Sequence, residues 1–72
     1  MAYTRTVLAR ADKASDIEVH VSGLETEDGN LFIDIREYVV SLDQYGRGIT
    51  VPSRMLSTLK DGLNAFSTHE DE

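Results

Sequence analysis

Residues 31–40 read LFIDIREYVV, and the alternation of their side chains decides the fold of this 72-residue chain. Successive side chains of a β-strand point to opposite faces of the sheet. One face of this stretch is apolar apart from Glu37, and it carries Leu31, Ile33, Ile35 and Val39. The other face is mostly polar, and it carries Phe32, Asp34, Arg36 and Tyr38. The stretch therefore predicts a strand that packs one face in a core and presents the other to a ligand.

Three other stretches are typical of strands. Residues 17–22 read IEVHVS and alternate strictly, with His20 on the polar side. Residues 5–9 read RTVLA and residues 48–51 read GITV, and their β-branched side chains favour two short strands. Thr50, in the last of these, is expected on the polar face. The four stretches together predict a four-stranded sheet.

The segments between these stretches carry turn residues. Asp28-Gly29 lies in the loop 27–30 and is a strong signal for a hairpin. Residues 43–46 read DQYG and supply a second reversal, while residues 11–16 read ADKASD and form a polar link. Connections of this length favour antiparallel neighbours, so the predicted sheet is antiparallel.

After Val51 the apolar spacing changes from two residues to three and four, which is typical of a helix. Pro52 suits the first helical turn, where its missing N–H costs nothing. The apolar stripe consists of Met55, Leu56, Leu59, Leu63 and Phe66. We therefore predict an α+β domain over residues 1–68, a four-stranded curved antiparallel sheet followed by one C-terminal helix (β-β-β-β-α). An acidic tail follows at residues 69–72.

The small size of the chain predicts self-association. A domain of 72 residues buries a modest core and usually recruits disulfides, a metal or a partner subunit. The chain has no Cys, and His20 and His69 lie far apart, so neither a disulfide nor a metal site is expected. We therefore expect a homodimer, with the helix stripe in the core or against the partner.

The formal net charge of −6 argues, by itself, against binding to nucleic acid. Six of the acids are grouped in one loop and at one end of the chain, namely Glu25, Glu27, Asp28, Glu70, Asp71 and Glu72. Without them the chain is neutral. A local positive groove is therefore compatible with the sequence, but a strong electrostatic funnel is not.

No enzyme motif is present in the sequence. Gly46-Arg47-Gly48 is too short to cradle a phosphate, and Asp34 and Glu37 point to opposite faces of a strand, so they cannot act as a carboxylate pair. No apolar run approaches 18 residues. We expect a non-enzymatic protein without cofactor or membrane contact. The expected location is the cytoplasm, near the nucleoid or in a phage's host, or the nucleus if the source is eukaryotic.

The run Ile33-Asp34-Ile35-Arg36-Glu37-Tyr38, the later run Gly46-Arg47-Gly48-Ile49-Thr50 and the helix after it resemble the positive cofactor four (transcriptional coactivator) family. The resemblance covers residues 17–66 and is nearest to the bare bacterial or phage domain. It implies a dimer whose curved sheets bind single-stranded DNA without sequence preference, in transcription, replication or recombination. The family often has Trp where Val39 stands, and an aromatic and Lys where Leu24 and Glu25 stand. Weaker DNA binding is therefore expected.

The resemblance and the polar face together assign the expected DNA contacts. Arg36 and Arg47 are expected to hold phosphates. Tyr38 and Phe32 are expected to stack on bases, unless Phe32 is buried in the dimer. Weaker candidates for phosphate contacts are Lys13, Arg5 and Arg10. Candidates for hydrogen bonds to the strand are His20 and Thr50.

Two other functions stay open at this point. The first is a protein-interaction module of the same fold with weak or no DNA affinity, which the acidic balance favours. Its partners would be replication or transcription proteins. The second is an acidic DNA mimic, which needs acids spread over a face, whereas here they sit in one loop and one tail. The tail is either an inhibitory or partner-binding segment or a solubilising end.

Overall fold

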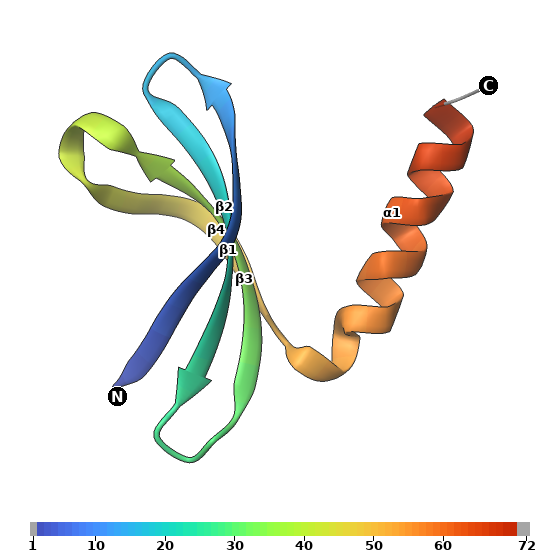
Figure 1. Cartoon of the computed structure of the whole chain (residues 1–72), viewed down its shortest axis with the longest axis horizontal. Coiled ribbons are helices and arrows are strands. Elements are labelled where there is room, and N and C mark those ends of the chain that lie inside the picture. The colour runs from blue at the N-terminus through green and yellow to red at the C-terminus, as the bar shows by residue number, and fades with distance from the viewer. Residues whose placement is uncertain (1, 71–72) are drawn as a thin grey trace.

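The computed structural model describes residues 2–70, with side chains through residue 67. Its four strands are β1 (Tyr3–Ala14), β2 (Ile17–Thr26), β3 (Leu31–Val39) and β4 (Gln44–Pro52), and its helix is α1 (Leu56–Glu70). The strands form one antiparallel sheet in the order β1-β2-β3-β4, strongly twisted in Figure 1. The predicted four-stranded antiparallel sheet followed by one C-terminal helix is confirmed.

The outer strands are longer than the sequence predicts. The polar link expected at residues 11–16 is wrong, because Ala11–Ala14 continue β1 and only Ser15 and Asp16 form the turn to β2. Register shifts between Val7 and Ala9 and between Asp12 and Ala14 interrupt the alternation of β1. A bulge adds one unpaired residue and breaks the period of two, which is why the sequence pattern stopped early.

The reversal before β4 also lies earlier than expected. A short 3₁₀ turn spans Val40–Leu42, and Asp43 follows it with φ 50°, in the left-handed region. β4 therefore begins at Gln44 and includes Tyr45 and Gly46, which the sequence analysis placed in the turn. The predicted hairpin at Asp28-Gly29 is present, with Gly29 at φ 83°.

The register confirms the two predicted faces of the sheet. Val21 pairs with Ile35 and Ile35 with Ile49, which places these side chains on one apolar face. On the opposite face His20 pairs with Arg36, and Arg10 pairs with His20. We call the first the aliphatic face and the second the polar face.

Burial is the reverse of the expectation that the apolar face of the sheet packs in a core. The buried side chains among the described residues belong to the polar face, and they are His20, Ser22, Leu24 and Asp34. On the aliphatic face Ile49 is 55% exposed, and on α1 Leu63 is 68% exposed. The helix contacts mainly the 3₁₀ turn Ser53–Met55 and stands apart from the sheet (Figure 1). Aliphatic side chains on sheet and helix therefore face an open groove.

Gly48 allows the closest backbone approach between β3 and β4. A Cβ atom at this position would lie 2.4 Å from the carbonyl oxygen of Ile35 and 2.7 Å from the Cα of Arg36. Both are backbone atoms, which cannot rotate away as a side chain can. Gly48 therefore keeps β4 against the part of β3 that carries Arg36.

We predict that Gly48→Ala lowers the free energy of unfolding by about 1–3 kcal/mol, because strand separation must absorb the overlap. Gly46→Ala is the matched control in the same strand, since a Cβ there meets nothing within 4 Å. Urea unfolding followed by circular dichroism, at one protein concentration, measures both variants. Equal stability of the two variants would contradict the close-approach argument.

Candidate nucleic-acid interface

A shallow pocket of about 450 Å³ opens on the polar face and collects residues from all four strands. Tyr3 and Arg5 come from β1, Leu24 from β2, Arg36 from β3 and Thr50 from β4. Cross-strand neighbours in an antiparallel sheet point to the same side, so the register alone brings these side chains together. The pairing of the strands therefore forms the pocket.

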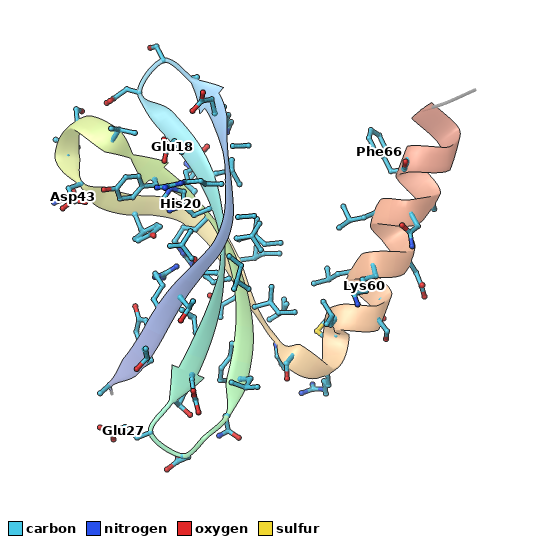
Figure 2. All side chains as sticks on the ribbon, viewed as in Figure 1. Glu18, His20, Glu27, Asp43, Lys60 and Phe66 are labelled. Atoms are coloured by element: carbon cyan, nitrogen blue, oxygen red, sulfur yellow. The ribbon has the colours of Figure 1, made fainter. Side chains whose placement is uncertain are left out.

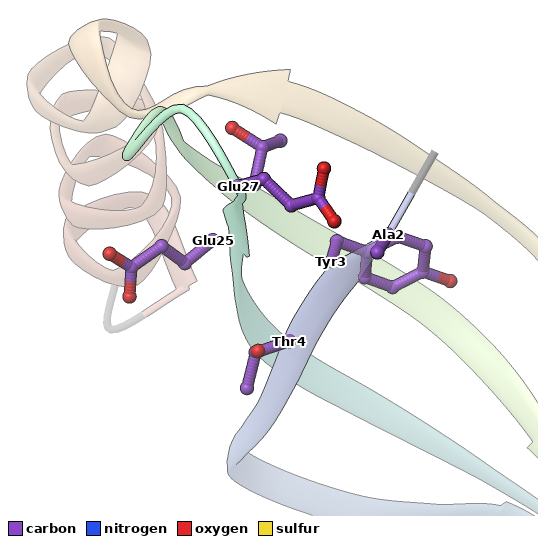
Figure 3. Close-up of a pocket in the computed structure, with 6 residues that line it drawn as sticks. Ala2, Tyr3, Thr4, Glu25 and Glu27 are labelled. Atoms are coloured by element: carbon purple, nitrogen blue, oxygen red, sulfur yellow. The ribbon is translucent and has the colours of Figure 1, made fainter.

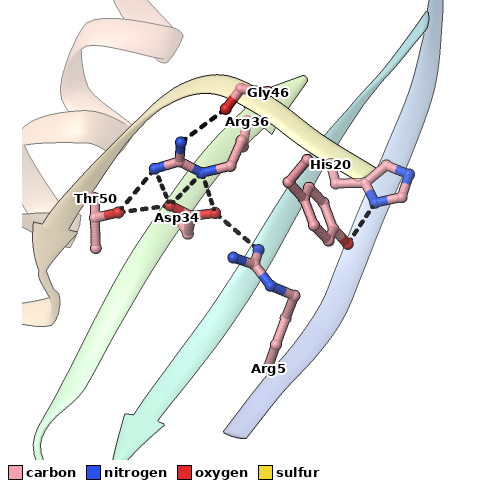
Figure 4. Close-up of polar contacts among 7 residues, drawn as sticks. Arg5, His20, Asp34, Arg36, Gly46 and Thr50 are labelled. Atoms are coloured by element: carbon pink, nitrogen blue, oxygen red, sulfur yellow. Dashed lines mark hydrogen bonds and ion pairs between the residues drawn. The ribbon is translucent and has the colours of Figure 1, made fainter. Parts of the chain in front are cut away.

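Asp34 lies at the centre of this pocket and organises it (Figure 4). Its side chain is fully buried, yet it accepts hydrogen bonds from three neighbours. Arg5 Nη1 donates to Oδ2 at 2.8 Å, and Thr50 Oγ1 donates to Oδ1 at 2.6 Å. Arg36 donates through Nε at 3.1 and 3.2 Å and through Nη2 at 3.1 Å. A single carboxylate thus fixes two guanidinium groups side by side.

Two opposing effects set the pKa of Asp34, namely its burial and the hydrogen bonds that it accepts. Burial alone would raise the pKa, because it disfavours the charged carboxylate. Hydrogen bonds from Arg36, Thr50 and Arg5 outweigh burial and lower the pKa from 3.8 to about 2. Asp34 is therefore ionised at neutral pH. The Arg5–Asp34–Arg36 network then carries one net positive charge, since both arginines stay protonated.

Arg36 lies on the polar face as predicted, but most of its donors are used inside the protein. Besides its bonds to Asp34, its Nη1 donates to the carbonyl oxygen of Gly46 at 2.9 Å. Its Nη2 lies 3.3 Å from Thr50 Oγ1. The side chain is about 25% exposed, so one edge of the guanidinium still reaches the pocket. Thr50, predicted to bond a DNA strand, instead donates to Asp34.

Three aromatic rings form a cluster beside the network. His20 stacks on Tyr38 with centroids 4.6 Å apart and 21° between the planes, and meets Tyr45 edge-on at 5.4 Å. Tyr38 and Tyr45 lie 5.0 Å apart. The guanidinium carbon of Arg5 lies 4.1 Å from the centroid of Tyr45, a cation–π contact. Arg5 therefore joins the aromatic cluster to Asp34.

His20 is only 4% exposed and forms two hydrogen bonds within the protein. Its Nε2 lies 2.8 Å from Glu18 Oε1, and its Nδ1 lies 2.9 Å from the hydroxyl of Tyr45. A carboxylate only accepts hydrogen bonds, so Nε2 donates; in the neutral ring Nδ1 then accepts from Tyr45. Figure 2 shows His20 and Glu18 on the same side of the sheet. His20, predicted to bond DNA, is engaged in holding the sheet together.

Tyr38 is half-buried, and both its ring and its hydroxyl have partners. One ring face stacks on His20, and the hydroxyl donates to Asp43, which directly precedes β4. The hydrogen bond to the charged carboxylate raises the pKa of Tyr38, because it favours the protonated phenol. The expected role of Tyr38 as a free stacking platform is therefore restricted to its other ring face.

The remaining predicted phosphate contacts are divided between the two faces. Arg10 is exposed and belongs to the polar face, in the same cross-strand row as Arg36. Lys13 forms an ion pair with Glu37, and this contact lowers the pKa of Glu37. The charge of Arg47 also lowers the pKa of Glu37, and Arg47 does not line the pocket around Asp34. The polar face thus carries Arg5, Arg10 and Arg36, of which Arg5 and Arg36 line the pocket, whereas Lys13 and Arg47 lie outside it.

Phe32 lies on the polar face, paired with Leu24 and Pro52 at the end of the sheet nearest α1. It is half-buried and lines a separate pocket of about 260 Å³ with Arg54. The described residues contain no group of three or more acidic or His side chains that could hold a metal ion. Over the same residues, no helix is long and apolar enough to cross a membrane.

Sequence reasoning missed three members of this interface. Asp34 was assigned to an exposed polar face, although an acid between Arg5 and Arg36 on neighbouring rows indicates an internal counter-ion. Tyr45 falls within the predicted turn 43–46 and Tyr3 precedes the predicted strand 5–9, whereas the structure places them in β4 and β1. The contacts of Asp34 depend on the register between strands, which a pattern of alternation within one strand does not contain.

We predict that Asp34→Asn lowers the free energy of unfolding at pH 7 by about 2–4 kcal/mol. The reason is that it leaves the largely buried guanidinium groups of Arg5 and Arg36 without their counter-ion. Acid denaturation adds a second readout. The folded pKa of Asp34 is about 2 and its ordinary value is 3.8, so its contribution is full above pH 4 and is lost as the pH falls to 2. That loss is about 2 kcal/mol in the wild type and absent in the variant.

Glu37→Gln is the control for this experiment. Glu37 also has a lowered pKa, but it lies at the protein surface, where it pairs with the exposed Lys13. We expect little change in its urea midpoint at pH 7. Urea titrations of the three proteins at pH 7 and pH 3 give the comparison, and about half of this loss, about 1 kcal/mol, is expected at pH 3. An Asp34→Asn protein as stable as wild type at pH 7 would rule out Asp34 as the organising group.

Comparisons with known proteins do not assign this chain to a family. Neither protein-family models, nor curated proteins, nor solved structures give a match to the chain. The likeness to the positive cofactor four family therefore stays a resemblance of motifs and element order. The functional argument rests on the side chains of the polar face.

Proposed function

We propose that this protein binds single-stranded DNA, without preference for sequence, as a small homodimer. The observation that carries the proposal is the open pocket in which Arg5 and Arg36 are fixed beside aromatic side chains. Guanidinium groups suit phosphate oxygens, and aromatic rings suit unstacked bases. Both features occur together in proteins that bind single strands.

The Arg5–Asp34–Arg36 network supports modest rather than tight binding. Asp34 neutralises one of its two positive charges, and its pKa of about 2 keeps it ionised at neutral pH. The two guanidiniums are nevertheless pre-positioned, so little side-chain entropy is lost when a phosphate approaches. Arg10 adds a third cation in the same row as Arg36. The network therefore offers oriented donors at a small net charge.

The open groove between sheet and helix supports the dimer. Val21, Ile35, Leu59 and Leu63 are among the side chains that line this groove of about 370 Å³. In Figure 2 the ring of Phe66 projects from α1 toward the same space. Apolar surface of this extent is unfavourable in water, and a lone 15-residue helix is marginally stable without packing. A second copy of the chain supplies matching aliphatic surface from the same residues.

A second candidate function is a protein-interaction module with weak or no affinity for DNA. The net charge of −6 favours it, as does the use of Arg36 donors by Asp34, Gly46 and Thr50. The two functions differ in salt dependence. Phosphate contacts produce a linear fall of log affinity with log salt, whereas a module that does not bind DNA gives no signal with an oligonucleotide.

We predict that the protein binds a labelled single-stranded oligonucleotide more tightly than a duplex of equal length. Arg10→Ala should weaken this binding by about 1 kcal/mol and lower the salt slope by about one unit, because one phosphate contact is lost. Arg54→Ala is the matched control, with the same charge change in the turn before α1. Fluorescence anisotropy over a salt series measures both quantities.

Arg10 is the better probe than Arg36, because removing Arg36 also strips three hydrogen bonds from Asp34 and destabilises the fold. Equal losses in Arg10→Ala and Arg54→Ala would show a general charge effect rather than a site on the polar face. Duplex binding as tight as single-strand binding would also contradict the proposal.

We predict that analytical ultracentrifugation at micromolar concentration gives about twice the chain mass of 8.0 kDa. Leu63→Glu should shift the protein toward the monomer, because it places a charge in the apolar groove. Ser57→Glu is the control on the same helix, outside the groove-lining set. A folded wild-type monomer at this concentration would refute the dimer.

A further inference from the structure

We infer that Tyr3 is the side chain on which a DNA base stacks, and that the neighbouring phosphate lies on Arg5 and Arg36. This inference rests on the proposed function and gives it one defined binding position. Tyr3 begins β1 and lines the pocket that contains Arg5, Asp34 and Arg36.

Exposure distinguishes Tyr3 from the other tyrosines. Tyr3 is 55% exposed, whereas Tyr38 and Tyr45 are half-buried. The rings of Tyr38 and Tyr45 already contact His20 and each other, and Arg5 covers one face of Tyr45. Among the side chains of residues 2–67, no ring lies against Tyr3. The hydroxyl of Tyr3 hydrogen-bonds to Arg5, but its ring is not covered by another ring, so a base reaches the ring without displacing a ring contact.

The charges on the two sides of Tyr3 set the path of the strand. On one side lie Arg5 and Arg36, within the pocket of the polar face. On the other side a second hollow of about 300 Å³ is lined by Glu25 and Glu27 together with Tyr3 (Figure 3). Carboxylates repel phosphates, so the DNA backbone is expected to run on the arginine side and to leave the protein near Tyr3.

The size of the pocket fits one nucleotide rather than a helix. Its volume of about 450 Å³ lies within the usual range for small-ligand sites, and it is shallow and open to solvent. Leu24 is a buried apolar member of the lining, and Tyr3 and Thr50 line the pocket from the two outer strands, β1 and β4. A flexible strand with unstacked bases enters such a pocket, whereas a duplex keeps its bases inside its own stack.

The test compares two fluorescein-labelled oligonucleotides of equal length, oligo(dT) and an abasic strand with the same number of phosphates. Tyr3→Ala should weaken binding to oligo(dT) by about 5- to 150-fold, the range for loss of one stacked base, and leave binding to the abasic strand unchanged. Tyr3→Phe should bind oligo(dT) nearly as well as the wild type, because it keeps the ring and loses only the hydroxyl bonded to Arg5. Tyr3→Leu should bind like Tyr3→Ala, because apolar bulk without a ring does not stack.

Leu8→Ala is the control on the same strand, at a residue that is 67% exposed and lies against Gly23 on the aliphatic face. It should leave both affinities unchanged. Wild-type binding to oligo(dT) with no loss in Tyr3→Ala would overturn the role of Tyr3 while leaving the proposed function standing. A wild-type protein that binds neither oligonucleotide would overturn both. Circular dichroism of each variant confirms that the sheet is retained.

Discussion

The buried carboxylate of Asp34 is the interaction on which the rest of the polar face depends. It is fully buried, and it holds donors from three of the four strands, Arg5 on β1, Arg36 on its own strand β3 and Thr50 on β4. A buried charge is tolerated only when its lone pairs are satisfied, so each of these side chains is required in its observed position. Asp34 therefore ties the outer strands to the centre of the sheet in a domain whose apolar core is small.

This arrangement explains why the better-buried face of the sheet is the polar one. Small domains cannot cover every apolar side chain, and here the aliphatic face and the helix stripe stay largely open within one chain. The polar face instead closes on itself through hydrogen bonds and stacked rings. The polar face thus buries its side chains within a single copy, apart from the unpaired hydroxyl of Ser22, whereas the aliphatic face gains most from association. The proposed division between DNA binding and dimer formation follows this difference.

Much of the fold could be predicted from the sequence because alternation and turn chemistry are local. Residues 17–22 alternate strictly and residues 31–39 alternate apart from Glu37, and they lie in the central strands β2 and β3. The length of β1 could not be predicted, because bulges at Val7–Ala9 and Asp12–Ala14 break that period. The faces of Arg36 and Tyr38 were predicted, but their internal partners depend on register between strands. The contacts of Asp34 and His20 therefore emerged only from the three-dimensional arrangement.

The two bulges of β1 have a consequence for the behaviour of the protein at high concentration. β1 and β4 are the outer strands, and an outer strand with regular spacing is a template for adding strands from other molecules. Irregular register twists β1 and removes the even row of donors and acceptors that a foreign strand needs. On the other side, Pro52 at the end of β4 has no N–H to offer. Neither outer strand therefore offers a regular edge on which a strand from another molecule can pair. This opposes growth into fibres even though much aliphatic surface is exposed.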